Sequence, residues 1–277
     1  MFSRSDLKIV ADALAEAARV EIMPRFRNLT AGAVRTKTSA VDLVTDADES
    51  AERHIIANLS KTFPNAVFVG EESTEKDKSL LGAIADADLA IIIDPVDGTA
   101  NFASGLPLFG VMAAVAIKGE TVGAAIYDPL VEDWALALKG EGAWFEEMDG
   151  STRDLRVADA VPVSDMIGCT SWNNAPEPTR STLAANQARF RGSYVFRNAA
   201  HEYRLTASGH LHYLMFHKLM PWDHAPGALI VEEAGGFVRC FDGSLYTAAI
   251  HEGGILVAVD EDSWYAAREA LLDMPRG

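Results

Sequence analysis

A continuous apolar run at Leu89–Ile93 is the strongest constraint on the fold of this chain of 277 residues. A strand with one face in water alternates apolar and polar residues, whereas this run is apolar at every position. It therefore predicts a strand that is buried on both faces. A shorter strand is expected at Val67–Val69 and ends at Gly70. Because 49% of the residues are apolar, the chain can bury such strands in one large domain or two modest ones.

The residues from 110 to 145 are rich in β-formers and are divided by short breaks. Breaks this short leave no room for crossover helices, so they predict an antiparallel meander. The expected strands are Gly110–Lys118, Thr121–Tyr127, Trp134–Leu138 and Ala143–Phe145. Before this region, apolar spacing predicts helices at Met1–Phe26 and Asp46–Phe63, with a loop or hairpin at Leu29–Val41 between them.

After residue 150 the pattern changes, because predicted strands and helices alternate. The expected strands are Ile167–Ser171, Tyr194–Phe196, Leu211–Phe216, Phe237–Phe241 and Gly254–Val259. The expected helices are Pro178–Arg189, Ala199–Ser208, Asp223–Ala234 and Asp262–Leu272. Such alternation is typical of an α/β unit. We therefore predict the α/β fold class, with an α+β subdomain over residues 1–150 and an α/β subdomain over residues 151–277 in one compact catalytic unit.

The charge and the cysteines restrict the class of protein. The formal net charge of −16 argues against nucleic acid as a ligand, because binding needs a basic face against the phosphates. No stretch approaches the roughly 18 uninterrupted apolar residues of a membrane span, so none is expected. The two cysteines, Cys169 and Cys240, lack metal-site spacing and are expected as buried, reduced thiols of a cytoplasmic protein.

The loop after the buried strand is the most informative segment for chemistry. Asp94 leaves the strand, Pro95 prevents further regular pairing, and a turn brings Asp97 back beside Asp94. Two carboxylates at one strand end repel each other unless a cation lies between them. Gly98 and Thr99 would then open a helix whose free N–H groups point at an anion. The alternative is that Asp97 is only a helix N-cap and Asp94 only a turn former.

Three other segments place carboxylates where a strand ends or a helix begins. They are Asp42–Asp48, Glu71 with Glu72 after Gly70, and Asp223 after Pro221-Trp222. Taken singly, each is typical of a surface charge or a helix cap. Taken together, they supply only oxygen ligands without His or Cys ligand spacing, which favours Mg²⁺ or Mn²⁺ over zinc.

Together with the loop at Asp94, these segments resemble the inositol monophosphatase family of the lithium-sensitive, magnesium-dependent phosphatases. The segments that keep the order and spacing of the family are Val41–Thr45, Gly70–Ser73, Ile93–Phe102, Pro221–Asp223 and Glu233–Gly236. The most specific of them is Ile93–Phe102. The resemblance covers most of the chain and implies an alternating αβαβα layered sandwich, usually a homodimer, with a lithium-sensitive activity.

The resemblance also implies a role for each matched residue. Two or three Mg²⁺ ions would be held by carboxylates and one backbone carbonyl, from Glu71, Asp94, Val96, Asp97 and Asp223. Asp48 and Thr99 would form a dyad that orients and deprotonates the attacking water, with Glu71 as the third catalytic residue. The N–H groups of Gly98 and Thr99 would bind the phosphate, and Lys37 would add positive charge near it.

The substrate side departs from the inositol-specific pattern. The expected substrate contacts are Lys37, Asp97, Arg197, Ala199, Phe216 and Asp223. Phe216 takes the position of a hydroxyl-binding Glu, and its ring cannot accept such a hydrogen bond. Arg197 would bind a second phosphate or a carboxylate of the substrate; the alternative is a surface salt bridge, for example with Glu202.

We therefore expect a Mg²⁺-dependent phosphatase that hydrolyses a small phosphate monoester by direct attack of metal-activated water, without a phosphoenzyme. Inositol 1-phosphate or a related polyol or sugar phosphate is the first expectation. Fructose 1,6-bisphosphate, histidinol phosphate and 3′-phosphoadenosine 5′-phosphate are alternatives within the same chemistry. An alternative of another class is a regulatory protein that binds the transcription or ribosome machinery.

Overall fold

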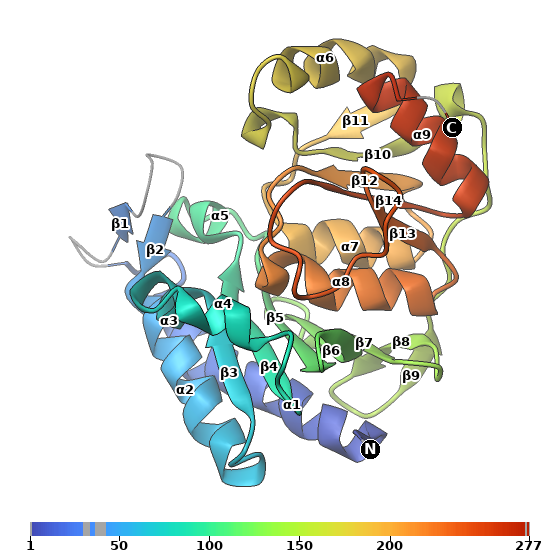
Figure 1. Cartoon of the computed structure of the whole chain (residues 1–277). Helices are drawn as coiled ribbons and strands as arrows, with labels where there is room; N and C mark the ends of the chain where they lie inside the picture. Colours follow the sequence, from blue (N-terminus) through green and yellow to red (C-terminus); the bar gives the residue numbers. More distant parts are fainter. Residues whose placement is uncertain (1, 30–33, 37–42, 275, 277) are drawn as a thin grey trace.

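Five alternating layers of helices and sheets make up the molecule (Figure 1). The computed structural model describes residues 2–29, 34–36, 43–274 and 276. Helices α1 and α2 cover one face of a seven-stranded sheet, α7 and α8 lie between that sheet and a five-stranded one, and α6 and α9 cover the far face. Separate apolar clusters fill the spaces between the layers. The predicted αβαβα sandwich of the α/β class is confirmed.

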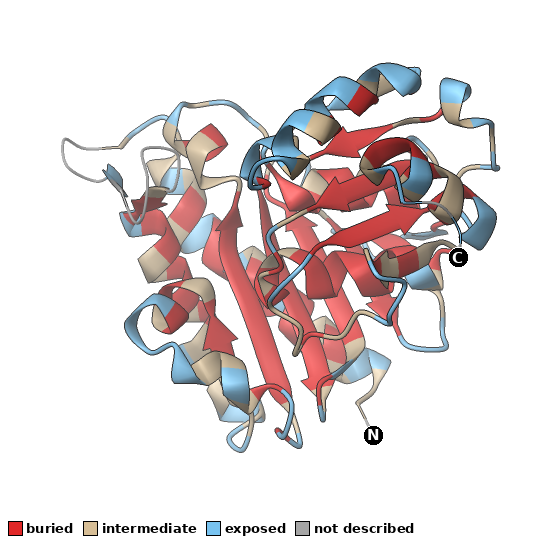
Figure 2. Cartoon of the chain, turned by 45° about the horizontal axis from the view of Figure 1, so that its top comes forward, coloured by how far each residue is buried: buried red, intermediate tan, exposed pale blue. Residues whose placement is uncertain are grey.

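The seven-stranded sheet contains the predicted meander. In spatial order it is β3 (Val67–Gly70), β4 (Ala90–Asp97), β5 (Gly110–Ile117), β6 (Glu120–Asp128), β7 (Asp133–Leu138), β8 (Ala143–Glu147) and β9 (Thr152–Asp154). β3 and β4 are parallel, and every later pair is antiparallel. All the residues of β4 are buried, as the apolar run predicts (Figure 2). Strand β9, whose residues are all exposed, was not predicted.

The helices on the outer face of this sheet begin with paired capping contacts. α1 (Arg4–Ala17) starts with a capping box between Ser3 and Asp6 and continues through one π-helical and one 3₁₀ turn to Arg25. α2 (Asp46–Thr62) starts with a capping box between Thr45 and Asp48. Between them, β1 (Val34–Thr36) pairs antiparallel with β2 (Leu43–Thr45), so the second strand lies beyond the predicted range of Leu29–Val41, and residues 37–42 lie outside the described residues. Three short helices follow: α3 (Glu71–Lys76), α4 (Ser79–Ala83) and α5 (Thr99–Ala103).

The rest of the chain alternates strands and helices as predicted. The strands, in spatial order, are β11 (Gly192–Tyr194), β10 (Ile167–Thr170), β12 (Tyr213–Phe216), β14 (Ile255–Ala258) and β13 (Phe237–Cys240). The helices are α6 (Thr179–Asn186), α7 (Ala199–Ala207), α8 (Pro221–Glu233) and α9 (Glu261–Leu272). β10 runs parallel to β11 and β12, whereas β14 is antiparallel to β12 and β13. Strand β11 lies two residues earlier than expected, and α8 begins at Pro221 rather than Asp223, since Pro favours the first helical position.

The central helix α8 brings the two sheets together. It contacts β4, β5, β6 and β7 on one side and β13 on the other, and it packs against α7. The approach to α7 requires a glycine, because a Cβ atom at Gly227 would lie 2.0 Å from the Tyr203 ring. This packing sets the N-terminus of α8, with Asp223 in its first turn, opposite the end of β4.

Two further predictions concern membranes and thiols. Within the described parts of the chain, every helix is too short or too polar to span a bilayer. Cys169 and Cys240 are buried and free, as expected.

Candidate active site

The loop that carries the acidic signature is the distorted end of β4. Pairing with β5 does not stop at Pro95 as predicted; it skips Pro95 and Val96 in a bulge and resumes with Asp97 opposite Gly110. That prediction was wrong because a bulge can take a proline out of the hydrogen-bonded ladder without ending the strand. The Oδ1 atom of Asp94 accepts the N–H of Val96 at 3.1 Å, which holds the bulge closed.

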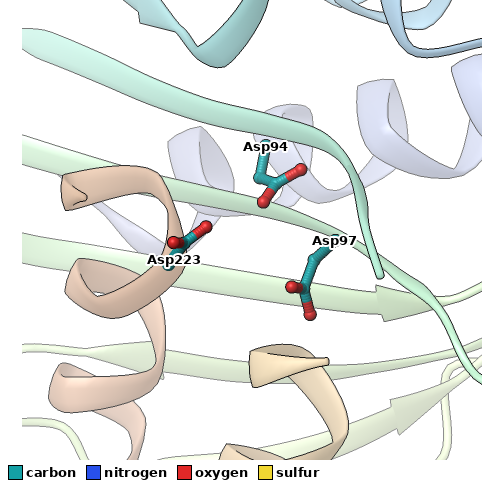
Figure 3. Close-up of side chains that lie close together, drawn as sticks. All are labelled: Asp94, Asp97 and Asp223. Carbon is teal, nitrogen blue, oxygen red and sulfur yellow. The ribbon is translucent and has the colours of Figure 1, made fainter. Parts of the chain in front are cut away.

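Three carboxylates converge on this bulge. One oxygen each of Asp94, Asp97 and Asp223 lies within 4.8 Å of the other two (Figure 3). Asp94 and Asp97 are buried. Burial and then the charge of Asp223 raise the pKa of Asp97 to about 8. Burial and then the charge of Glu71 raise the pKa of Asp94 well above its usual range. A cation among these oxygens would remove the repulsion, and an all-oxygen set fits Mg²⁺ or Mn²⁺.

Glu71 approaches the same cluster from a different element. It is the first residue of α3 and lines the cavity beside Asp97 and Asp223. A residue that the sequence reasoning missed positions it: Glu52 on α2 accepts the N–H groups of Glu72 at 2.7 Å and Ser73 at 2.8 Å. The first turn of α3 is therefore held by a buried carboxylate, and Glu72 is itself buried rather than at the surface.

One sequence signal could have found Glu52. It lies four residues after Asp48 and thus on the same face of α2. In the structure, Glu52 also accounts for the glycine at position 70, since a Cβ atom there would lie 2.2 Å from the Glu52 carboxyl group.

Asp48 and Thr99 are in direct contact. The Thr99 hydroxyl lies 3.0 Å from Asp48 Oδ1 and 3.0 Å from the carbonyl oxygen of Val96. Asp48 is fully buried, and its other oxygen accepts the Thr45 N–H at 2.9 Å. Burial raises the pKa of Asp48 to about 6, although the hydrogen bonds from Thr45 and Thr99 lower it. Asp48 is thus both a capping residue of α2 and a partner of Thr99.

A cavity of about 430 Å³ opens beside these residues. Gly98, Thr99 and Ala100 at the start of α5 line it together with Glu71, Asp97 and Asp223. Gly98 has φ +93°, a conformation that favours glycine, and a Cβ atom there would lie 2.7 Å from the Asn198 side chain. The helix start, whose first N–H groups have no partner within a helix, therefore faces the same space as the carboxylates.

Asp97 also joins the seven-stranded sheet to helix α7. Its carboxylate accepts the N–H groups of Ala199 at 3.2 Å and Ala200 at 2.5 Å, the first two residues of α7. The side chain of Asn198 donates to the Asp97 carbonyl at 2.6 Å and caps α7. Asp97 is therefore not an N-cap of α5, where Gly98 takes that position. It is an acceptor for the N-terminus of a helix about 100 residues away.

His201 supports this contact through hydrogen bonds; the sequence favours a hydrogen-bonded structural or surface residue at this position, without indicating its partners. Its Nδ1 atom lies 2.6 Å from Asn198 Oδ1 and its Nε2 atom 3.0 Å from Asp128 Oδ2. Through Asn198, the ring helps to orient the backbone around Asp97. The acidic Asp128 at the end of β6 is the only sequence signal for this network.

Comparison with known proteins identifies the arrangement. A sequence profile described as the inositol monophosphatase family matches residues 3–272. The chain belongs to the inositol monophosphatase family. It is 36% identical over 208 residues to the Nus factor SuhB of Escherichia coli, with 73% of each chain covered. It is 30% identical over 210 residues to a fructose-1,6-bisphosphatase/inositol-1-monophosphatase of Thermotoga maritima, with 76% of each chain covered.

A solved structure of a family member shares the fold. The Thermotoga maritima IMPase superposes with a TM-score of 0.80 at 25% identity, over 97% of this chain and 99% of that one. Family membership supports phosphatase chemistry and dependence on a metal, and the acidic cluster at the end of β4 could bind one.

In this member of the inositol monophosphatase family, a further set of residues lines the part of the cavity that is expected to hold the substrate. Arg197, Ala199 and Phe216 line the cavity, together with Ser171, Asn173, Asn174, His217 and Lys218. Arg197 donates to Asn101 Oδ1 at 2.8 Å, whereas Glu202 accepts the Phe196 N–H, so the two do not form the salt bridge considered above. Lys37 lies outside the described residues, as does Asp42.

The raised carboxyl pKa values predict how stability depends on pH. The pKa of Asp97 is near 3.8 in the unfolded chain but about 8 in the folded one, and the pKa of Asp94 shifts in the same direction. The folded state therefore holds protons that the unfolded state has released, so the free energy of unfolding of the metal-free protein falls from about pH 5 to about pH 8. Thermal denaturation in a chelator should show a falling Tm over this range, and saturating Mg²⁺ should abolish the fall. A Tm that is level or rises in the chelator would contradict the raised values.

Proposed function

We propose that the chain is a Mg²⁺-dependent phosphatase that hydrolyses a small phosphate monoester by direct attack of water. The observation that carries this proposal is that Asp97 and Asp223, two carboxylates of the acidic cluster, line one cavity together with Glu71 and the start of α5. A phosphate dianion needs positive charge and N–H donors, and the attacking water needs a base.

The metal would be held by the residues that surround the bulge of β4. Glu71, Asp94, the Val96 carbonyl, Asp97 and Asp223 are the proposed ligands of two or three Mg²⁺ ions, and the same oxygen ligands suit Mn²⁺. When bound, such ions supply a positive charge that stabilises the transferring phosphoryl group and lowers the pKa of water.

The remaining steps belong to the side chains and backbone of the chain. We assign the Thr99 hydroxyl, which donates to Asp48, to orienting the water and passing its proton toward the Asp48 carboxylate. Glu71 faces the same space and would orient the water from the other side. The N–H groups of Gly98 and Thr99 would bind the phosphate, as a helix start does. Asp97 accepts the first N–H groups of α7 and would therefore fix the end of β4 relative to the start of α7.

The proposed substrate is inositol 1-phosphate or a related polyol or sugar phosphate. Fructose 1,6-bisphosphate, histidinol phosphate and 3′-phosphoadenosine 5′-phosphate stay as alternatives, and one relative is named for two of these activities. Arg197 would bind a second anionic group, and Phe216 and Ala199 would pack against the body of the substrate.

The test is hydrolysis of these four phosphates by the purified protein with Mg²⁺, with and without Li⁺. We expect phosphate release from at least one of them, loss of the activity with a chelator, and inhibition by Li⁺. No release from any monoester, with bound Mg²⁺ confirmed by calorimetry, would refute the proposal.

A second candidate function is regulatory, and the names of relatives favour it. Several are called Nus factor SuhB, at 34–36% identity. We propose as the alternative that the chain also binds a protein of the transcription or ribosome machinery; affinity capture from lysate, with an active-site variant as bait, would separate this role from catalysis. We further propose, from family membership, that the protein is a cytoplasmic homodimer, which light scattering would test.

A further inference from the structure

A buried glutamate that the mechanism does not use lines the substrate cavity. Glu202 lies on α7, three residues after Ala199, and residues at this spacing share one face of a helix. Both line the cavity. Long helical side chains lean toward the helix N-terminus, which here is the end that holds Asp97. Glu202 thus extends along the cavity wall toward the proposed phosphate site.

Only one of its two carboxyl oxygens has a partner within the part of the chain that the structure describes. Oε1 accepts the N–H of Phe196 at 3.0 Å. Oε2 is buried and makes no hydrogen bond to any described residue. Leaving such a buried oxygen without a hydrogen bond destabilises the folded protein. Burial raises the pKa of Glu202 to about 8, so the carboxyl group holds a proton near neutral pH in the ligand-free protein, and a hydrogen-bond donor on a ligand would favour release of that proton. A ligand with an O–H or N–H group would supply the missing donor.

Another residue that lines the same cavity, Phe216, is apolar. Phe216 lines the cavity at the end of β12, and its ring stacks on that of Tyr203, with centroids 5.5 Å apart. Tyr203 is the next residue after Glu202 on α7. The cavity wall therefore combines the apolar ring of Phe216 on β12 with the carboxyl group of Glu202 on α7.

We propose that Glu202 is the specificity-determining residue of the site and accepts a hydrogen bond from a donor in the part of the substrate beyond its phosphate. The inference rests on the proposed phosphatase function and narrows it to phosphomonoesters whose alcohol carries a hydroxyl or an ammonium group. Arg197 is a separate contact, since its guanidinium group can bind only an anion or a neutral acceptor.

The test compares substrates in a neutral, nearly isosteric variant, Glu202→Gln. The amide retains an oxygen for the Phe196 N–H, so the α7 end should stay in place. Three substrates are used: p-nitrophenyl phosphate, whose alcohol carries no donor, inositol 1-phosphate with hydroxyls, and histidinol phosphate with an ammonium group. We expect kcat/KM to fall about 10- to 100-fold for the preferred donor-bearing substrate, mainly through KM, and to stay unchanged for p-nitrophenyl phosphate.

The outcomes separate the roles that Glu202 could have. A loss confined to inositol 1-phosphate supports a hydroxyl donor, and a loss confined to histidinol phosphate supports an ammonium donor. An equal loss on all three substrates, or no loss on any, overturns the inference. So does a wild-type enzyme that hydrolyses p-nitrophenyl phosphate at least as well as both donor-bearing substrates.

Two controls keep the result interpretable. Glu252→Gln removes the same charge from an exposed position and should change nothing. If Glu202→Gln fails to fold, Glu202→Asp keeps the charge but shortens its reach and should show the same discrimination between substrates. A wild-type protein that is inactive on all three substrates and also on fructose 1,6-bisphosphate and 3′-phosphoadenosine 5′-phosphate refutes the phosphatase function itself and the inference with it.

Discussion

Asp94→Asn should abolish phosphatase activity while making the metal-free protein more stable. Asp94 is buried at the point where Asp97 and Asp223 converge, and the substitution removes one of the charges that hold the proposed ions. A lost contribution of about 4 kcal/mol to transition-state stabilisation corresponds to about a 10³-fold lower rate. The same substitution relieves repulsion when no cation is bound. A gain of about 1 kcal/mol would raise Tm by about 2–4 °C in a protein of this size.

Calorimetric titration with Mg²⁺, steady-state kinetics and thermal denaturation in a chelator measure these effects separately. The amide introduced by Asp94→Asn would retain an oxygen for the Val96 N–H, so the bulge should persist. The matched control is Asp159→Asn, which removes a charge from an exposed loop and should leave all three measurements unchanged. Full activity of Asp94→Asn, or a lower Tm of its metal-free form, would show that Asp94 is a structural residue.

The layered core could be predicted because its strands carry strong local patterns. The apolar run at Leu89–Ile93 predicted β4, and short breaks predicted the antiparallel order of β5 to β8. Strand β9 escaped prediction because its residues, Thr152–Asp154, are polar and exposed, so only pairing with β8 makes them a strand. The continuation of β4 past Pro95 was not predicted for a related reason. A bulge depends on pairing with the neighbouring strand rather than on the conformational preference of the local residues.

The candidate site, like the fold, contains residues that the sequence predicts and residues that it does not. Asp94 and Asp97 could be paired from sequence because they lie on one strand end, and the family resemblance added Asp223 from another helix. The role of Glu52 and the partners of His201 were missed because they arise from contacts with segments that local patterns do not connect. Glu52 meets the start of α3, and His201 meets Asp128 on the first sheet. Such supporting contacts depend on how the layers pack against one another. That packing is determined by many residues together and cannot be read from any single segment.

Thr99→Ala should lower kcat by about 10²- to 10⁴-fold without weakening Mg²⁺ binding. The Thr99 hydroxyl has one hydrogen but two oxygen neighbours at 3.0 Å, Asp48 Oδ1 and the Val96 carbonyl. If the carbonyl helps to hold a cation, the hydrogen is left for Asp48, and the lone pairs of the hydroxyl can accept a proton from water. Thr99→Ser keeps this hydroxyl and should retain most of the activity, which makes it the matched control.

The dyad also predicts how two substitutions combine. Asp48→Asn places an amide where Thr45 and Thr99 both donate, so the orientation of the Thr99 hydroxyl should be lost even though the side chain volume is kept. If the two residues act as one unit, the double variant Asp48→Asn/Thr99→Ala should be about as slow as the slower single variant, because the second change removes an interaction already broken. Single-turnover kinetics with saturating Mg²⁺ would measure the three rates. Multiplicative losses would mean that Asp48 serves only to cap α2, and that another group accepts the proton of the water.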